Sequence, residues 1–471
     1  MVSLQPADIN PSSIVDRSPN QQILPLSAKV SDGGQLEVGG CSVVELVKQY
    51  GSPLYIVDEQ TVRAACQQYD QAFKNFYPGP SQVLYASKAW SCMAICALVT
   101  SENLGLDVVS GGELYTALQA GVDPNNIYFH GNNKSIAELE MALASGCTIV
   151  ADNWLELEQL VALEKAQESQ GTAPRVMLRI TPGIECHTHE YIRTGHLDSK
   201  FGFDPNQIDQ VLNFAQNNPQ LDWVGFHAHI GSQIFELQPH QDLTSVVVSW
   251  LTMAHSRNLS MTELNIGGGL GMRYVESDDP PSITQWSEVV CQGIVQACQA
   301  AQIPLPKLLC EPGRSLIGPA CITAYTVGAH KSIPDIRTYL TVDGGMSDNP
   351  RPITYQSVYS AAIANRMETA ATEVVTVAGK HCESGDVLLK DIALPASQPQ
   401  DVLVVMGTGA YNYSMASNYN RLPRPAAVLV RDGEANPILK RETYSDLIRQ
   451  DCLPRYLEQS VADEHNGNQT G

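Results

Sequence analysis

The sequence is poor in basic residues and contains no long apolar segment. Across 471 residues, 29 lysines and arginines stand against 50 aspartates and glutamates, which gives a net charge of -21. Nucleic acids and anionic membranes bind through basic patches, so this balance disfavours both partners. There is no run of about 18 apolar residues, and residues 1–27 have polar breaks where a signal peptide has its apolar core. We therefore expect a cytoplasmic protein that acts on small molecules.

Two kinds of motif are also missing. The twelve cysteines are scattered, and no two have the C-x-x-C spacing of a zinc or redox site, so reduced core thiols are expected. No G-x-x-x-x-G-K-[ST] motif occurs. The triple glycine at 267–269 does not continue into G-x-G-x-x-G, because Met272 stands at the third glycine position. Nucleotide-binding functions are therefore disfavoured.

Residues 80–312 alternate short apolar or β-branched runs with longer segments of helical spacing. The expected strands are 83–86, 106–109, 127–129, 147–150, 175–180, 223–229, 264–266 and 308–311. Helical patterns cover 112–120, 136–144, 154–168, 208–215, 243–255 and 286–301. This alternation indicates right-handed βαβ units, and a strand number near eight favours an α/β fold with a closed (β/α)₈ TIM-type barrel. An open doubly wound sheet is the alternative.

The pattern changes after Arg314 to short β-rich segments separated by turn residues, at 321–327, 338–342, 373–377, 386–389, 401–405 and 426–431. These predict a second, mainly antiparallel β domain, which residues 36–57 are expected to complete. A chain of this length also exceeds what one core usually organises. We predict a polar, mobile extension over 1–27, a barrel over 58–319, a β domain from 28–57 and 320–460, and a mobile tail over 461–471.

Lys88 follows the apolar run 83–86, where a buried strand is expected to meet a helix. Burial favours the neutral form of an amine, and a neutral amine can form a Schiff base with a carbonyl, which is how pyridoxal phosphate is anchored. The alternative is a strand-end lysine with its ammonium in solvent.

Unusual residues follow most of the other expected strands, at the edge where barrel enzymes build their active sites. These segments are 110–113, 130–132, 227–232, 267–269 and 311–314. The glycines at 267–269 offer backbone N–H groups suited to a phosphate, although a plain tight turn explains them equally well.

His227 and His229 alternate along one expected strand and would share a face. A metal site needs a third ligand and none lies nearby in the sequence, so we expect no metal. An imidazole stacked on an aromatic cofactor ring explains His229 better. Glu311 follows three apolar residues and would either keep a pyridine nitrogen protonated or form an ion pair with Arg314.

Two polar clusters lie in the expected β domain. In HCESGD, residues 381–386, Cys382 stands between an imidazole and a carboxylate. A single cysteine is usually inert packing, but these neighbours favour an acid–base role. GTGAY, residues 407–411, is a glycine-rich turn that ends in the phenol of Tyr411.

Together these motifs resemble a known family. YASKAW around Lys88, DVVSGGEL from 107, HGNNKS from 130, HAHIGSQ from 227, NIGGGLG from 265, EPGRS from 311, NPRPITY from 349, HCESGD from 381 and GAYNYSMASNYN from 409 are similar to diaminopimelate decarboxylases. These enzymes belong to the alanine-racemase-like barrel family of pyridoxal phosphate decarboxylases. The resemblance runs from about residue 51 to 442.

The resemblance implies that Lys88 carries pyridoxal phosphate as a Schiff base and that His229 stacks on the ring. It implies a homodimer with shared active sites, in which Cys382 is the proton donor and reaches the partner's site with Glu383. The implied cofactor-binding residues are Lys88, His229, Ser232, Gly267, Gly268, Gly269, Glu311, Pro312, Gly313, Arg314 and Tyr411. The implied substrate-binding residues are Arg314, Arg351, Tyr355, Glu383 and Tyr411. Trp90 departs from the family, which usually has asparagine there, and the shape of the pocket near Lys88 is therefore in doubt.

The implied reaction is decarboxylation of meso-2,6-diaminopimelate to L-lysine. The far end of that substrate carries both an ammonium and a carboxylate, and two arginines suit the carboxylate. A relative acting on ornithine, arginine or carboxynorspermidine is one alternative. A catalytically silent cofactor-binding protein of the same fold is another.

Overall fold

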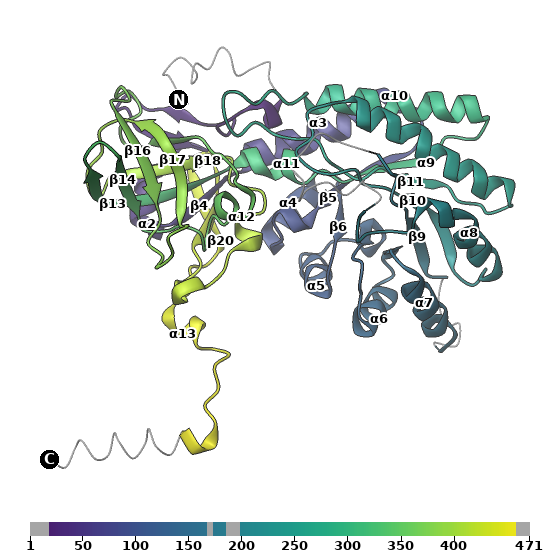
Figure 1. The fold of residues 1–471 in the computed structure, drawn as a ribbon. Coiled ribbons are helices and arrows are strands. Elements are labelled where there is room, and N and C mark those ends of the chain that lie inside the picture. The colour runs from purple at the N-terminus through teal and green to yellow at the C-terminus, as the bar shows by residue number, and fades with distance from the viewer. Residues whose placement is uncertain (1–17, 167–172, 185–197, 458–471) are drawn as a thin grey trace.

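Eight parallel strands close into a barrel, because β12 pairs with β5 (Figure 1). The computed structural model describes residues 18–166, 173–184 and 198–457. The predicted (β/α)₈ barrel is confirmed, and the open sheet is excluded. The strands are β5 Ser81–Ala86, β6 Gly105–Val108, β7 Ile127–Phe129, β8 Thr148–Ala151, β9 Arg175–Arg179, β10 Asp222–His227, β11 Glu263–Asn265 and β12 Lys307–Cys310.

Helices surround the barrel, so its strands are buried on both faces and consist almost wholly of buried residues. A capping box begins α6: the Ser135 hydroxyl accepts from the Glu138 N–H, and the Glu138 carboxylate accepts from the Ser135 N–H. The barrel interior is filled by Leu84, Tyr128, Val150, Met177, Val224 and Leu309. The helices are α3 Glu59–Phe76, α4 Met93–Ser101, α5 Gly111–Gln119, α6 Ile136–Ser145, α7 Trp154–Ala166, α8 Ile208–Asn217, α9 Gln238–Ser256, α10 Ile283–Ala301 and the short α11 Arg314–Ile317.

The second domain is a nine-stranded sheet around the long strand β13. Most pairs are antiparallel, as predicted, whereas β19 with β4 and β14 with β16 are parallel. The strands are β4 Leu54–Asp58, β13 Cys321–Ile333, β14 Arg337–Val342, β15 Ala361–Ile363, β16 Glu373–Ala378, β17 Val387–Leu394, β18 Val402–Met406, β19 Ala426–Arg431 and β20 Glu434–Leu439. The domain also holds α12 Arg351–Tyr355 and α13 Tyr444–Leu447.

The segment before the barrel divides between two sheets, so the prediction for residues 36–57 is right only in part. β4 joins the large sheet between β13 and β19. β2 Leu36–Val38 instead pairs with β1 Lys29–Val30 and β3 Cys41–Ser42 in a separate sheet, followed by α2 Val43–Tyr50. Of the expected mobile extension over 1–27, residues 1–17 lie outside the described residues, as does the expected tail over 461–471. Ser18, Pro19 and Asn20 are buried in and beside the short 3-10 helix η2 Pro19–Gln21, so this part of the expected extension is packed.

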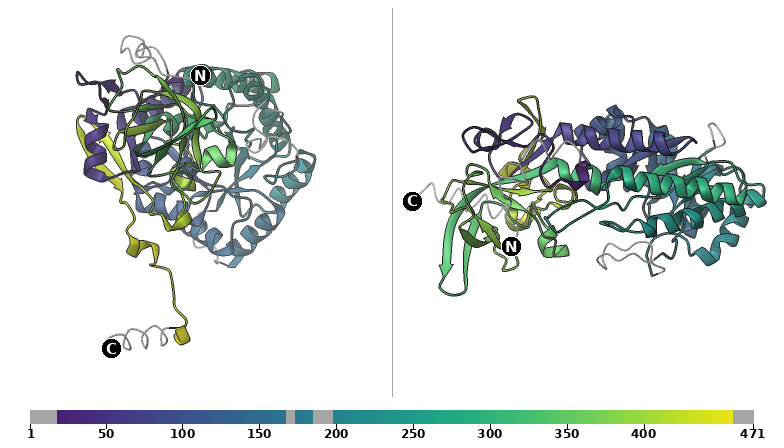
Figure 2. Two further views of the ribbon diagram at one scale, coloured as in Figure 1. Left: turned by 60° about the vertical axis from the view of Figure 1, so that its left-hand side comes forward. Right: turned by 90° about the horizontal axis from the view of Figure 1, so that it is seen from above.

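The two domains lie side by side, and the described chain after α13, up to residue 457, extends away from both (Figures 1 and 2). At their junction Trp90 is fully buried, stacked on Tyr413 with ring centroids 5.4 Å apart. The Tyr411 N–H donates to the carbonyl of Ala89, so the turn after β18 is attached directly to the segment that carries Lys88. The barrel and the β domain therefore meet at the predicted site.

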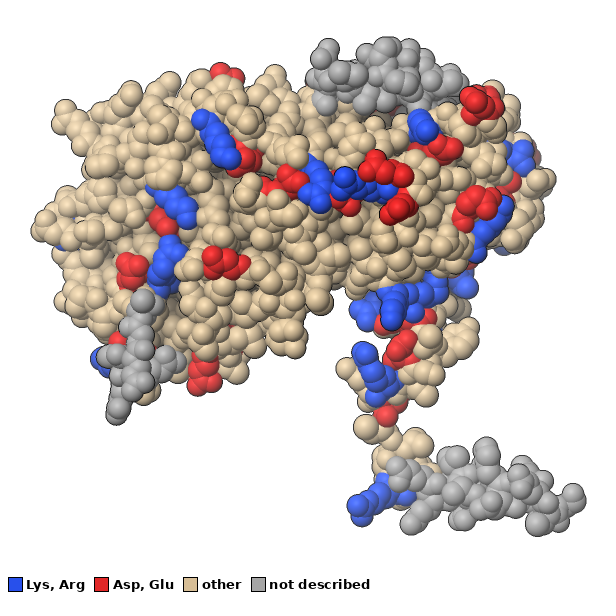
Figure 3. All heavy atoms as spheres, turned by 180° about the vertical axis from the view of Figure 1, so that it is seen from behind, with Lys and Arg blue, Asp and Glu red and all other residues tan. Residues whose placement is uncertain are grey.

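Two surface observations bear on the expected partners. In the part of the chain that the structure describes, no helix has the length and apolar character that crossing a bilayer requires. On the face seen in Figure 3, acidic side chains lie among the basic ones, and most of the visible surface carries neither.

Candidate active site

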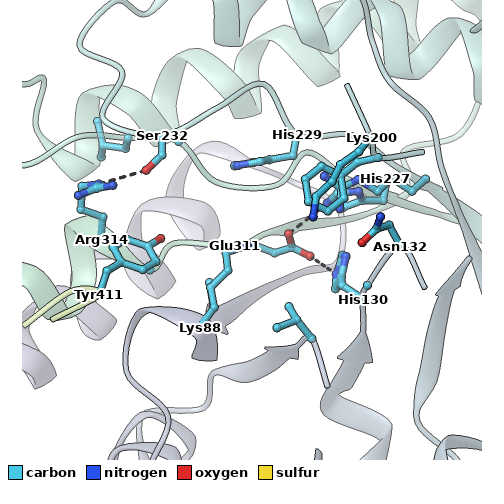
Figure 4. A pocket seen from close by; sticks show the side chains of 18 of the residues that line it. Lys88, His130, Asn132, Lys200, His227, His229, Ser232, Glu311, Arg314 and Tyr411 are labelled. Atoms are coloured by element: carbon cyan, nitrogen blue, oxygen red, sulfur yellow. Dashed lines mark hydrogen bonds and ion pairs between the residues drawn. The ribbon is translucent and has the colours of Figure 1, made fainter. Parts of the chain in front are cut away.

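A cavity of about 490 Å³ opens where the barrel strands end and the β domain begins. Arg314, Ser232 and Tyr411 lie at one end of it, His130 and His227 lie at the other, and Lys88 and Glu311 lie between them (Figure 4). Ten of the predicted site residues line the cavity: Lys88, His229, Ser232, Gly269, Glu311, Gly313, Arg314, Arg351, Tyr355 and Tyr411. Gly267, Gly268, Pro312, Cys382 and Glu383 are not among its lining residues in the described chain.

Lys88 lies in the short 3-10 helix η3 Ser87–Ala89, directly after β5. Its side chain is 41% exposed, and its Nζ is 3.5 Å from Oδ2 of Asp107 at the end of β6. Burial acts to lower the pKa of this amine, but Asp107, Tyr411 and Glu311 outweigh it and raise the pKa above its ordinary value. Burial does favour the neutral amine, as expected, but the negative groups around Lys88 outweigh it and favour the charged form. Lys88 is an ammonium with a carboxylate beside it.

Glu311 follows β12 and is buried between two histidines. Its Oε1 lies 2.8 Å from Nε2 of His130, its Oε2 lies 3.1 Å from Nε2 of His227, and Asn265 Nδ2 donates to Oε1 at 2.6 Å. Burial opposes ionisation, but the histidines outweigh it and hold the pKa of this carboxyl well below its usual range. Glu311 is therefore an ionised acceptor at the floor of the cavity, and the alternative that Arg314 is its ion-pair partner is wrong.

Folding also supplies the third ligand that the sequence did not show near His227. Ligating atoms of His130, His227 and Glu311 all lie within 4.8 Å of one another, and His229 is not part of this group. Burial lowers the pKa of His227 to about 3, so its ring is neutral, and its Nδ1 has no hydrogen-bond partner among the described residues. The three residues form a polar network in which each histidine faces the carboxylate.

His229 lies two residues beyond the end of β10, with its ring fixed by the glycine loop. The Gly268 N–H donates to Nδ1 of His229 at 3.2 Å. Burial, followed by the charge of Lys88, lowers the pKa of His229 well below its ordinary value, so the ring is neutral. A Cβ at Gly268 would lie 2.3 Å from the backbone oxygen of Glu311, which excludes any larger residue. Gly268 thus orients His229, whereas Gly269 lines the cavity.

Two arginines converge on one phenol at the other end of the cavity. The guanidinium of Arg314 lies 4.9 Å from the centre of the Tyr411 ring, and that of Arg351 lies 5.6 Å from it. Arg314 donates to the Ser232 hydroxyl at 3.1 Å and to the Tyr274 hydroxyl at 2.7 Å. The buried Nε of Arg351 has no acceptor among the described residues. Two clustered guanidiniums, one with an unused donor, form an anion site.

Cys382 and Glu383 lie on the exposed surface of the β domain. The backbone N–H of Cys382 donates to Oδ1 of Asn420 at 2.8 Å, and the preceding His381 is buried with its Nδ1 2.7 Å from Asp386. The segment is therefore well anchored, although it is not part of the cavity of its own chain.

Several cavity residues were not predicted as site residues, although the sequence offered signals for some of them. His130 follows β7 and was placed at the active-site edge by the rule that active-site residues follow barrel strands, but no role was assigned to it. Arg179 ends β9, so the same rule would have found it. Lys200 lines the cavity but follows no strand directly, and Tyr274 supports Arg314 from a long loop.

Known proteins resemble this chain over most of its length. Residues 59–318 match a family described as pyridoxal-dependent decarboxylase, pyridoxal binding domain. A diaminopimelate decarboxylase of Synechocystis is 62% identical over 93% of this chain and 95% of the relative. The diaminopimelate decarboxylase of Bacillus subtilis is 45% identical over 90% of this chain and 97% of the relative. The crystal structure of M. jannaschii diaminopimelate decarboxylase with L-lysine superposes with a TM-score of 0.83 at 31% identity, covering 92% and 99% of the two chains.

Proposed function

Because the chain belongs to the diaminopimelate decarboxylases, a family of pyridoxal-dependent decarboxylases, we propose which of its residues perform the reaction of that family. The enzyme decarboxylates meso-2,6-diaminopimelate to L-lysine and CO₂ with pyridoxal phosphate as cofactor. These residue roles rest on one observation: a single cavity contains an amine, a buried ionised carboxylate and two arginines. The crystal structure of a lysine/ornithine decarboxylase from Vibrio vulnificus is only 22% identical to this chain and shows a shared fold alone.

The residues of the cavity fit pyridoxal phosphate. Lys88 supplies the amine that anchors the cofactor. Glu311 supplies an ionised acceptor for a protonated ring nitrogen, and His229 supplies a neutral, flat ring that can stack on the cofactor ring. The buried donor of Arg351 and the glycine backbone at Gly269 are suited to anionic groups. When bound, the cofactor provides an electron sink for the electron pair left by the departing carboxylate.

Lys88 must lose a proton before its Nζ can bond to a carbonyl carbon. Asp107 Oδ2, 3.5 Å away, is the carboxylate that can take this proton. The negative charge of Asp107 also holds the ammonium in place until the carbonyl arrives. Asp107 is thus assigned to proton exchange with Lys88, although sequence analysis did not single it out.

Arg314 and Arg351 bind the carboxylate at the end of the substrate that does not react. The two guanidiniums flank Tyr411, and Arg351 also lies 5.2 Å from the Tyr355 ring, so both cations are held in place by aromatic faces. Glu383 takes the ammonium of the same end. The presence of two arginines favours a substrate with a distal carboxylate over one with a distal amine alone, such as ornithine.

Cys382 returns a proton to the α-carbon after CO₂ leaves, acting in the site of a second subunit. Its exposed position outside the cavity of its own chain supports this role, because the exposed segment 382–383 can enter a partner's site. The described cysteines are all free thiols, which suits a reducing, cytoplasmic location.

Turnover of purified, cofactor-loaded protein tests the assignment. We expect meso-2,6-diaminopimelate to yield L-lysine and CO₂ in equal amounts, with little release of CO₂ from ornithine, arginine or carboxynorspermidine. If neither product is released, the assignment is wrong and the protein is a catalytically silent cofactor-binding protein. Faster turnover of one of the other amines would reassign the substrate.

A further inference from the structure

The segment around η2, at residues 18–22, is buried at 18–20 and hydrogen-bonded to the long loop between β11 and α10. Asn20 is fully buried, and its Nδ2 donates to the carbonyls of Gly271 at 3.0 Å and Pro281 at 2.9 Å. The N–H of Arg273 donates in return to the carbonyl of Asn20 at 2.8 Å. One side chain thus joins both ends of the loop 271–281.

The same loop is held on its other side by the segment that follows β10. The side chain of Gln233 donates to the carbonyl of Met272 at 2.7 Å and accepts from its N–H at 3.1 Å. The N–H of Ile234 donates to Gly269, and the N–H of Gly271 donates to Ile234. The loop is therefore fixed between two segments that are far apart in the sequence.

These two attachments lie directly beside the acceptors of Arg314. Ser232, which accepts from Nε of Arg314, precedes Gln233, and Tyr274, which accepts from Nη1, follows Arg273. The orientation of the guanidinium therefore depends on how the loop 271–281 is held against residues 232–234. Asn20 supplies the contact on the Tyr274 side.

We propose that Asn20 is a positioning residue that fixes the loop 271–281 and thereby directs Arg314 toward the substrate's distal carboxylate. This rests on the proposed role of Arg314 in substrate binding. Asn20 touches neither substrate nor cofactor, and its effect passes through Tyr274. The segment at 18–22 is thus a part of the active-site framework.

The variant Asn20→Ala tests this inference, and Gln22→Ala is its matched control. Gln22 has a buried side-chain nitrogen with no hydrogen-bond partner among the described residues, so its loss removes an amide without removing a contact to the loop. We expect Asn20→Ala to raise KM for diaminopimelate about tenfold while kcat changes by less than about threefold, which is the pattern of lost binding. Gln22→Ala should leave both constants unchanged.

A double-mutant cycle with Arg314→Lys separates positioning from general destabilisation. If Asn20 acts through Arg314, adding Asn20→Ala to Arg314→Lys should raise KM by less than about twofold. Additive effects, or an unchanged KM in Asn20→Ala, would overturn the proposal. Should Asn20→Ala fail to fold, Asn20→Asp preserves the shape but faces the two carbonyls with an acceptor, and the same criteria apply.

Binding of L-lysine, measured by calorimetry, provides a readout that does not need turnover. Lysine retains the end of the substrate that Arg314 is proposed to bind, so its affinity should fall in Asn20→Ala by the same factor by which KM rises. Unchanged lysine affinity would overturn the positioning role. A wild-type protein that binds lysine but does not turn over diaminopimelate would instead count against the proposed function.

Discussion

The barrel half of the site and the β-domain half differ in how completely one chain builds them. On the barrel side, Glu311 is held by His130, His227 and Asn265, and Lys88 has Asp107 beside it. On the β-domain side, Arg351, Tyr355 and Tyr411 reach the cavity, whereas Cys382 and Glu383 remain exposed outside it. A single chain therefore completes the part that is proposed to hold the cofactor and leaves the proposed proton donor outside.

The largest effect is expected from the barrel half. Lys88→Ala removes the amine that we propose anchors the cofactor. Loss of a proton donor typically lowers turnover about 10²- to 10⁴-fold, and this variant should lose more than that. Borohydride reduction of loaded wild-type protein should fix one pyridoxyl group per chain, detectable by intact mass, and should fix none at this position in the variant.

Lys74→Ala is the control for this change, because Lys74 is exposed on α3 and, within the described part of the chain, pairs only with Asp70. It should retain both turnover and the fixed pyridoxyl group. A Lys88→Ala protein that still fixes the cofactor after reduction would show that another amine anchors it, and the barrel half would have to be reassigned.

A smaller effect is expected from the β-domain half. Cys382→Ala should lower kcat about 10²- to 10⁴-fold, the usual contribution of a placed proton donor, while the cofactor is still fixed by reduction. Cys452→Ala is the matched control, since Cys452 is the other exposed thiol among the described cysteines, and it should change nothing.

Mixing the two inactive variants tests whether the site is shared between subunits. A hybrid dimer of Lys88→Ala and Cys382→Ala chains contains one site with both residues intact, so some activity should return after subunit exchange. Absence of recovery, when exchange has been demonstrated by mass, would mean that Cys382 acts within its own chain or not at all.

The barrel half was also the more predictable half. Parallel strands end at one rim, so the order of strands alone placed Lys88, His229 and Glu311 together. The sequence did not reveal that His130 and His227 both face Glu311, because that contact joins three strands that are distant in the chain. Nor did it reveal Asp107 as the neighbour of Lys88, since a carboxylate inside a strand has no distinctive signal.

The β domain was harder to predict because its pairing is not local. In the sheet β4 lies between β13 and β19, although both of these strands are far from β4 in the sequence. β20 was missed because it is largely exposed and contains Pro437, and β15 was missed because it has three residues. The role of Arg351 came from the resemblance to known enzymes alone. For Cys382 the neighbouring residues indicated an acid–base role, and the resemblance added that it acts in the site of a partner subunit.

One buried group in each half should make stability depend on pH in opposite directions. In the barrel, burial lowers the pKa of His240 to about 3 from an ordinary value of 6.5, so between these values the unfolded chain binds a proton that the folded chain does not. Stability should fall as pH drops through this window. In the β domain, burial raises the pKa of Asp348 to about 7 from 3.8, against the hydrogen bonds from Tyr325 and Gly345, and here stability should fall as pH rises.

Urea denaturation between pH 4 and 6.5 separates these contributions, each of which changes the free energy of unfolding by up to about 1.4 kcal/mol per pH unit. His240→Phe removes the barrel group, so acidification should destabilise the variant less than the wild type. Asp348→Asn removes the β-domain group, so raising the pH should destabilise it less. The differences between variant and wild type should therefore slope in opposite directions with pH. If the difference for Asp348→Asn does not grow as pH rises, so that the two slopes have the same sign, burial does not hold Asp348 protonated. A carboxyl with an ordinary pKa in the folded protein would not lower the stability of the protein as pH rises.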